Sequence, residues 1–380
     1  MSTIKSMTMA GVFAAAFTCI CPMQLYAAQT PADATVVASG LLGPRGLAVG
    51  PDNDLYIAEA GSGGKNQTSP KQCMQVPNVG PYFGGLTARI SKVNQSGKLV
   101  TVASGFPSTL GAGGTAVIGV ADVVFLNGKL FALIGGGGCS HGNPHHPNGI
   151  AQVDVNNGKW KLIADLGIAY LSKHPAKFES PDDFEPDGTY YSMIASHGRL
   201  VTVEPNHGNM FSVSTSGQID PIIDISASQG HIVPTTIAER DGDFYVGNLN
   251  LFPIDPQWAR VQIVSKKDSD DYADFAPGFD SQGPYRIVDS KAGFTTVVSV
   301  RFGPDGLLYV LELSDAAGDP APGNGKVVRV KHSGEIEEVI TGLAVPTAMT
   351  FWGDSLYVSN LGAAPPGAGQ VLKFAISPGW

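Results

Sequence analysis

The sequence predicts an all-β protein, a six-bladed β-propeller with four antiparallel strands in each blade. Three observations predict it: a strand pattern that recurs six times, a tight turn before each recurrence, and an N-terminal segment that supplies the strand missing from the last repeat. Glycine (48 residues) and proline (27 residues) are abundant, and apolar residues make up 43% of the chain against 15% charged residues. This composition suits many short strands joined by turns around an apolar core.

The recurring element is a short apolar strand, which we interpret as the second strand of each blade. Turn pairs such as Asn127-Gly128 and Asp241-Gly242 come just before it, and such pairs supply the positive φ angles that hairpin turns need. Self-similarity of this kind is typical of propeller blades. The six strands are expected at residues 55–59, 130–134, 200–204, 244–248, 308–312 and 356–360.

The two ends of the chain predict how the ring closes. The last repeat, residues 346–376, supplies only three strands. The segment Thr35–Leu41 resembles residues 101–106, the outer strand of the first blade. We therefore expect it to complete the last blade, which removes a free sheet edge. Helix should be scarce, with one short helix expected at residues 168–173.

Residues 1–28 are expected to form a signal peptide, followed by one propeller domain at residues 29–380. Lys5 is the only charge before Asp33, and an apolar run ends before the small residues Ala27-Ala28. This apolar run is too short to span a membrane as a helix, and no later stretch of 18 apolar residues follows it. The predicted location is secreted or periplasmic, and we expect a monomer.

The net charge argues against one class of partner, and the cysteines indicate a disulfide. The formal charge of −9 argues against a nucleic-acid partner, because binding phosphates needs clustered Lys and Arg. Cleavage would leave Cys73 and Cys139, which lie in the insertions of adjacent blades. In an oxidising compartment we expect them to form a disulfide.

Long insertions follow the second strand in several blades. Equivalent junctions in a propeller lie together, so these loops should emerge on one face, the natural place for a small molecule, glycan or protein partner. The insertions are residues 61–86, 135–148, 251–257, 314–325 and 361–369.

Polar side chains recur at the ends of the second strands. Oxygen ligands converging from several strands suit a hard cation, so Ca²⁺ or Mg²⁺ is a candidate cofactor. The alternative is that these groups satisfy backbone donors, as buried polar groups must. The candidate metal ligands are Glu59, Asn248, Glu312 and Asn360, with Glu204 at the same position in the third blade.

Glu204 and His207 are the sharpest candidates for acid/base catalysis, because histidine titrates near neutral pH. The alternative is a local hydrogen-bonded pair. His141, His145 and His146 crowd one insertion and could bind a metal, but we expect them to lie in a solvated loop. Further candidate ligand-binding residues are Arg45, His197, His231 and Asn250.

Four phrases resemble the ScyD/ScyE family of mostly exported, NHL-like propellers. They are residues 42–61, Val203-Glu204-Pro205-Asn206-His207-Gly208, Gly230 to Thr236, and Phe244 to Leu249 with Phe252-Pro253 behind it. The family takes its name from gene clusters for the pigment scytonemin, and its molecular activity is poorly defined. The chain departs from the family pattern at Ser180–Gly188 and in having one cysteine in the first blade. More distantly, the blades resemble streptogramin lyase, a metal-dependent propeller with Glu and His on its top face.

Two hypotheses of function follow, and whether the chain is an enzyme stays open between them. The first is a binding scaffold that holds a ligand on the insertion loops. The second is a metal-assisted lyase or lactonase-like hydrolase that uses Glu204 and His207. A more distant third is a quinone-dependent sugar dehydrogenase, since such enzymes are also exported six-bladed propellers.

Overall fold

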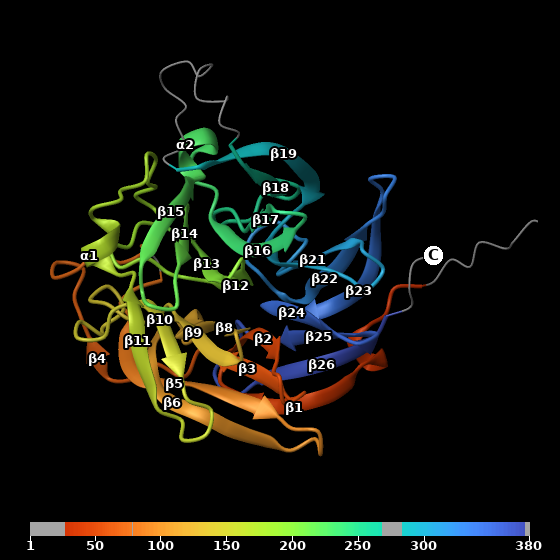
Figure 1. Cartoon of the computed structure of the whole chain (residues 1–380), viewed down its shortest axis with the longest axis horizontal. Helices are drawn as coiled ribbons and strands as arrows, with labels where there is room; N and C mark the ends of the chain where they lie inside the picture. Colours follow the sequence, from red (N-terminus) through yellow and green to blue (C-terminus); the bar gives the residue numbers. More distant parts are fainter. Residues whose placement is uncertain (1–26, 78, 268–282, 377–380) are drawn as a thin grey trace, which may run out of the picture.

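The computed structural model describes residues 27–77, 79–267 and 283–376. Within these residues six antiparallel sheets are arranged around a central axis, as Figure 1 shows in a view down that axis. The predicted six-bladed propeller is therefore confirmed. Almost all of the predicted signal peptide lies outside the described residues, so its assignment stays a prediction.

Each blade has an inner strand near the axis and an outer strand at the rim. The inner strands are β2 (Pro44–Val49), β8 (Val120–Leu126), β12 (Ser192–Ser196), β16 (Pro234–Arg240), β20 (Val297–Phe302) and β24 (Ala348–Trp352). The second strands are β3 (Leu55–Glu59), β9 (Lys129–Ile134), β13 (Arg199–Glu204), β17 (Asp243–Asn248), β21 (Leu308–Glu312) and β25 (Ser355–Asn360). All six second strands lie where the repeats predict them.

The third strands are β5 (Phe83–Val93), β10 (Gly149–Val153), β14 (Asn209–Val213), β18 (Ala259–Lys266), β22 (Pro322–Val330) and β26 (Gly369–Ala375). The outer strands are β6 (Leu99–Leu110), β11 (Trp160–Asp165), β15 (Ile219–Asp224), β19 (Tyr285–Phe294), β23 (Ile336–Ala344) and β1 (Thr35–Leu41). The first blade also carries the short strands β4 (Asn66–Gln67) and β7 (Val117–Ile118).

Helix is scarce, as expected. The predicted helix at residues 168–173 appears as α1 (Ile168–Leu171). A second helix, α2 (Ser226–Gln229), and the 3₁₀ turn η1 (Pro31–Asp33) were not expected, because neither segment has a repeating apolar pattern.

Ring closure follows the prediction. β1 pairs with β26 from Thr35 opposite Lys373 to Leu41 opposite Gly369. The sixth blade therefore joins the two ends of the described chain, and Figure 1 shows β1 beside β26 at the rim. Thr347 adds a bond from this blade to the first blade, because its hydroxyl donates to the Pro44 carbonyl at 2.6 Å.

The core is divided into six apolar clusters, one between each pair of neighbouring blades. Polar side chains on the inner strands add hydrogen bonds between blades. Asp122 accepts the Met193 N–H at 2.9 Å, and Thr236 accepts the Val300 N–H at 3.1 Å. Burial between sheets and bonds near the axis together fix the blades as one rigid support.

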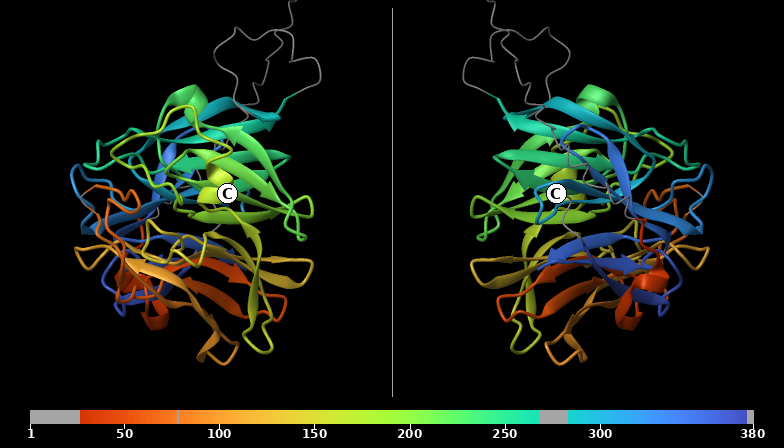
Figure 2. Two further views of the ribbon diagram at one scale, coloured as in Figure 1. Left: turned by 90° about the vertical axis from the view of Figure 1, so that its left-hand side faces the viewer. Right: turned by 90° about the vertical axis from the view of Figure 1, so that its right-hand side faces the viewer.

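The antiparallel strands place the loops on two faces. The junctions between second and third strands and the links between blades share one face, which we call the insertion face. The turns between first and second strands lie on the opposite face. The side views in Figure 2 show loops projecting from both ends of the strands.

Candidate functional site

The strand-end polar groups hold the links between blades. In four blades this side chain accepts a backbone N–H from the segment just before its own inner strand. The bonds are Leu42 N to Glu59 at 2.7 Å, Thr189 N to Glu204 at 2.8 Å, Thr295 N to Glu312 at 2.6 Å and Ala344 N to Asn360 at 2.8 Å. In the fourth blade Asn248 instead accepts the Arg260 N–H at 2.8 Å. The contacts favour the alternative interpretation, in which these groups satisfy backbone donors.

The oxygens proposed as metal ligands are therefore already bonded. Glu59 also accepts two guanidinium bonds from Arg89, at 2.7 and 2.8 Å, and one from the Ser91 hydroxyl. Within the described residues no group of three or more His, Cys, Asp or Glu is arranged to hold a metal ion. The donor set does not fit a Ca²⁺ or Mg²⁺ ring, although ion binding itself stays a prediction.

Glu204 and His207 form a buried pair on the insertion face. The turn after β13 folds back so that Glu204 accepts the backbone N–H of His207 at 2.6 Å. The same carboxylate lies 2.7 Å from Nδ1 of the His207 ring. This bond assigns the Nδ1 proton and leaves Nε2 without a hydrogen bond in the described chain, the orientation that acid/base chemistry requires.

His141 belongs to a second buried pair, which the sequence did not predict. Its Nε2 lies 2.8 Å from Glu185, and its Nδ1 lies 2.6 Å from the Gly137 carbonyl. Both side chains are fully enclosed. A solvated loop is thus wrong for His141, although His145 and His146 are exposed as expected.

His231 and Asp183 form a third pair. Asp183 Oδ2 lies 2.9 Å from Nε2 of His231, whose side chain is 7% exposed. Together the three pairs make up the carboxylate–histidine cluster. Asp183 and Glu185 both lie in the link between the second and third blades, and the Phe184 ring between them packs edge-on against His207.

Three buried polar atoms beside this cluster have no hydrogen-bond partner: Asn206 Oδ1, His231 Nδ1 and Asn250 Nδ2. They belong to one connected neighbourhood. Asn206 donates to the Asp183 carbonyl at 2.6 Å, and the Asp183 side chain bonds to His231. The backbone N–H of Asn250 donates at 3.1 Å to the carbonyl of Ile232, the residue that follows His231. Buried polar groups are normally bonded, so these atoms could form further hydrogen bonds. They are covered by the surrounding protein, so a ligand would bond to them only after neighbouring side chains turn aside.

Within each pair, the carboxylate and the imidazole shift each other's pKa. Burial alone would lower the pKa of His207, but the Glu204 carboxylate raises it above the usual value, and Glu185 does the same for His141. Burial would raise the pKa of Glu204 and of Glu185, yet the facing imidazole lowers each. Asp183 differs, because burial dominates and raises its pKa. The first two pairs therefore favour the ionised state in mildly acidic solution.

The remaining candidates lie apart from one another. Arg45 lies near the axis at the insertion face, donating to the Val117 carbonyl at 2.6 Å, with its guanidinium 5.8 Å from the centre of the Tyr191 ring. His197 lies in the turn between β12 and β13, on the opposite face, with its side chain 76% exposed. The structure does not bring His197 together with His231 or Asn250.

The Cys73–Cys139 disulfide is confirmed. It joins the insertions of the first two blades, with the two Cα atoms 5.8 Å apart. Ser140, the next residue, donates twice to Asp187, from its N–H at 2.8 Å and its hydroxyl at 2.9 Å. The bridge thus ties the first blade to the loop that carries His141.

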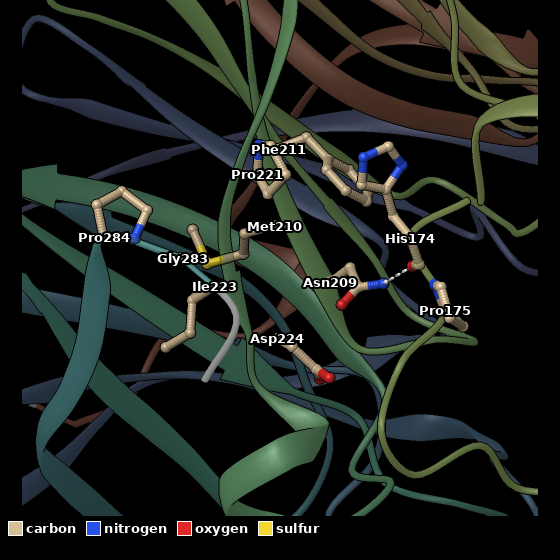
Figure 3. Close-up of a pocket in the computed structure, with 10 residues that line it drawn as sticks. All are labelled: His174, Pro175, Asn209, Met210, Phe211, Pro221, Ile223, Asp224, Gly283 and Pro284. Carbon is tan, nitrogen blue, oxygen red and sulfur yellow. Dashed lines mark hydrogen bonds between the residues drawn. The ribbon is translucent and has the colours of Figure 1, made fainter. Parts of the chain in front are cut away.

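A separate cavity of about 310 Å³ lies on the flank of the third blade, beside β14 and β15 (Figure 3). Apolar side chains such as Met210, Phe211 and Ile223 line most of it. Its buried carboxylate, Asp224, already accepts bonds from Lys177 N at 2.8 Å and from Ser226. The cavity and the cluster therefore lie at different places. We assign more weight to the cluster because three buried polar atoms in its neighbourhood lack hydrogen-bond partners.

No family model matches the chain, and no curated protein matches its sequence significantly. The resemblance to the ScyD/ScyE family therefore stays an expectation. The fold is similar to that of regucalcin, a calcium-binding protein from Agrobacterium tumefaciens, with 13% identity, a TM-score of 0.52 and coverage of 93% of this chain and 96% of that one.

Two further solved structures resemble it. The PQQ-bound aldose sugar dehydrogenase from Streptomyces coelicolor gives 12% identity and a TM-score of 0.51, covering 89% of this chain and 96% of that one. A Bacteroides thetaiotaomicron protein of unknown function gives 11% identity and a TM-score of 0.53, covering 92% and 74%. At these identities the likeness shows the fold alone. No helix in the described residues is long and apolar enough to cross a membrane.

Proposed function

We propose that the chain is an exported β-propeller that binds a small polar molecule on its insertion face, between the third and fourth blades. The observation that carries this proposal is the neighbourhood of Asn206, His231 and Asn250, where three buried polar atoms lack partners. A ligand that bonds to them would recover the cost of leaving them unpaired, about 1–3 kcal/mol each. Export is supported by the disulfide, since such bonds persist in oxidising compartments.

A thermal-shift screen tests the proposal. We would use a panel of neutral sugars, polyols, hydroxy acids and amino acids, and we expect at least one compound to raise the melting temperature. The Asn250→Ala and His231→Ala variants should lose that shift, while His197→Ala on the opposite face should keep it. Failure of every compound, or a shift that survives both variants, would overturn the proposal.

A second candidate function, ester or lactone hydrolysis, is favoured by the Glu204–His207 geometry. Here His207 Nε2 would take a proton from an attacking water, and Glu204, bonded 2.7 Å from Nδ1, would position the ring. His207→Ala should then reduce kcat by roughly 100-fold or more. Glu204→Gln should shift the pH profile, because the variant no longer stabilises the charged imidazole. Hydrolysis that is unchanged in His207→Ala would exclude this function.

A further inference from the structure

The loop at residues 249–258, which we call the aromatic loop, holds large apolar side chains in solvent. Phe252 is 48% exposed and Trp258 is 68% exposed. The loop follows the second strand of the fourth blade, so it belongs to the insertion face. Trp258 is the most exposed of the large apolar side chains in the described chain.

The backbone of the aromatic loop is fastened at several points. Its middle bonds to the fifth blade, where Ile254 and Gly318 exchange hydrogen bonds of 2.7 and 3.1 Å. Its base is closed by Asn248, which accepts the Arg260 N–H at 2.8 Å. Because the loop is anchored, the exposure of its aromatic side chains does not come from a loose backbone. Apolar side chains held in water on an anchored loop are typical of a recognition surface.

Both aromatic residues belong to the loop that carries Asn250, one of the three residues with an unpaired atom. Phe252 follows Asn250 by two residues, which limits the separation of their Cα atoms to roughly 7 Å. Trp258 is two residues before Arg260, the residue bonded to Asn248. Asn248 in turn donates to the Asn250 side-chain oxygen at 2.6 Å. Phe252 is therefore close to Asn250 along the chain, and Trp258 lies two residues before the bond that closes the same loop.

The unpaired atoms specify the ligand's hydrogen-bonding groups. Asn206 Oδ1 is an acceptor and Asn250 Nδ2 is a donor. His231 directs Nε2 at Asp183, so its Nδ1 is an acceptor in the neutral ring. An anion supplies acceptors only and would meet the carboxylates of the cluster, while an ammonium group supplies donors only. Neighbouring hydroxyl groups both donate and accept, and so satisfy all three atoms.

We propose that this part of the insertion face binds a carbohydrate. Once the side chains that cover these atoms turn aside, the hydroxyls of one sugar ring bond to Asn206, His231 and Asn250. The apolar C–H face of the same or the next ring packs on Phe252 or Trp258. The inference rests on the proposed function and names its ligand class.

Affinity electrophoresis tests it, with soluble β-glucan, xylan, mannan and α-glucan cast into native gels. We expect at least one polysaccharide to retard the protein. Trp258→Ala should weaken that binding about tenfold, or roughly 1.4 kcal/mol. Phe178→Ala is the matched control, because Phe178 is also an exposed aromatic residue (49%) but lies in the link between the second and third blades. Melting curves of each variant establish that it is folded.

Each outcome decides between the two proposals. Retardation that Trp258→Ala and Asn250→Ala weaken, but Phe178→Ala does not, supports carbohydrate binding. If no polysaccharide retards the protein while a non-carbohydrate compound stabilises it through Asn250, the ligand class is wrong and the proposed function stands. If no polysaccharide retards the protein and no compound of the thermal-shift panel stabilises it, both the carbohydrate inference and the proposed function are wrong. Equal loss in Phe178→Ala would assign the retardation to nonspecific adhesion and overturn the inference.

Discussion

At the scale of single residues, the three histidines of the carboxylate–histidine cluster differ in which ring nitrogen is free. His141 uses both nitrogens internally, on Glu185 and on the Gly137 carbonyl. His207 uses Nδ1 and keeps Nε2 free, whereas His231 uses Nε2 and keeps Nδ1 unpaired. His141 therefore fastens the loop, and only the other two can meet a ligand.

The buried His141–Glu185 pair predicts a pH-dependent stability. The pKa of His141 is raised from 6.5, so its contribution is complete below pH 6.5 and is lost as the pH rises through the folded-state value. The pKa of Glu185 is lowered from 4.5, so its contribution is present above pH 4.5 and is lost as the pH falls through the folded-state value. We expect Glu185→Gln to lower the free energy of unfolding by about 3 kcal/mol between pH 4.5 and pH 6.5, and by less outside this range.

Melting temperatures measured by circular dichroism from about pH 4 to pH 9 would check this window. The matched control is Glu239→Gln, because Glu239 faces the exposed His197 at 3.5 Å on the opposite face. A Glu185→Gln deficit that does not change with pH would contradict the ion pair.

Sequence spacing explains which pairs could be predicted. Glu204 and His207 are three residues apart in one turn, so their contact is visible in the sequence. Glu185 and Asp183 are joined to their histidines only by the fold, across 44 and 48 residues. In the sequence, the part of this link at residues 180–188 appeared only as a departure from the ScyD/ScyE pattern. No local periodicity marks contacts between residues so far apart in the sequence.

At the scale of elements, the strand-end side chain in four of the six blades fastens the second strand to the segment before its inner strand. The alternation of the strand brings the last side chain to the insertion face, where the link's N–H groups need an acceptor. Carboxylate and amide oxygens both meet this need, which is why Glu and Asn exchange at the position. Sequence alone could align these residues, but it could not separate a ring of ligands from a set of separate bonds.

The fifth blade offers a test of this fastening. Glu312 is buried and accepts the Thr295 N–H at 2.6 Å, so Glu312→Ala should cost about 1–3 kcal/mol of unfolding free energy. Glu312→Gln keeps an acceptor and should recover most of that loss, as urea unfolding would measure. Glu335→Ala is the control, because Glu335 is an exposed partner of Lys331. If Ca²⁺ or Mg²⁺ instead stabilised only the Glu312 protein, the metal-ligand interpretation would be restored.

At the scale of the whole molecule, the ring has no gap because β1 completes the sixth blade. The pattern of repeats predicted this closure, because the last repeat lacks its outer strand and the segment Thr35–Leu41 resembles an outer strand. The sequence did not predict the extra strands β4 and β7. β4 forms where the first blade's insertion pairs with β5, and β7 lies in the link to the second blade, where it pairs with β6.

Closure predicts unequal effects along one strand. Leu41 is fully buried between the sixth and first blades, so Leu41→Ala should lower the free energy of unfolding by about 2–5 kcal/mol. Val36 lies on the same strand but is 53% exposed, and Val36→Ala should change stability by less than about 0.5 kcal/mol. Thermal unfolding of the two variants would decide; similar effects would mean that the closing strand does not contribute to the core.

The pairing of β1 with β26 also sets how the molecule can be tethered. Leu41 and Gly369 meet at the insertion face, so Thr35 and Ala375 lie at the far end of the same two strands. A tag, carrier or support attached through either segment therefore pulls from the side away from the insertion loops. An immobilised sample should keep those loops turned toward the solution, free for whatever they recognise.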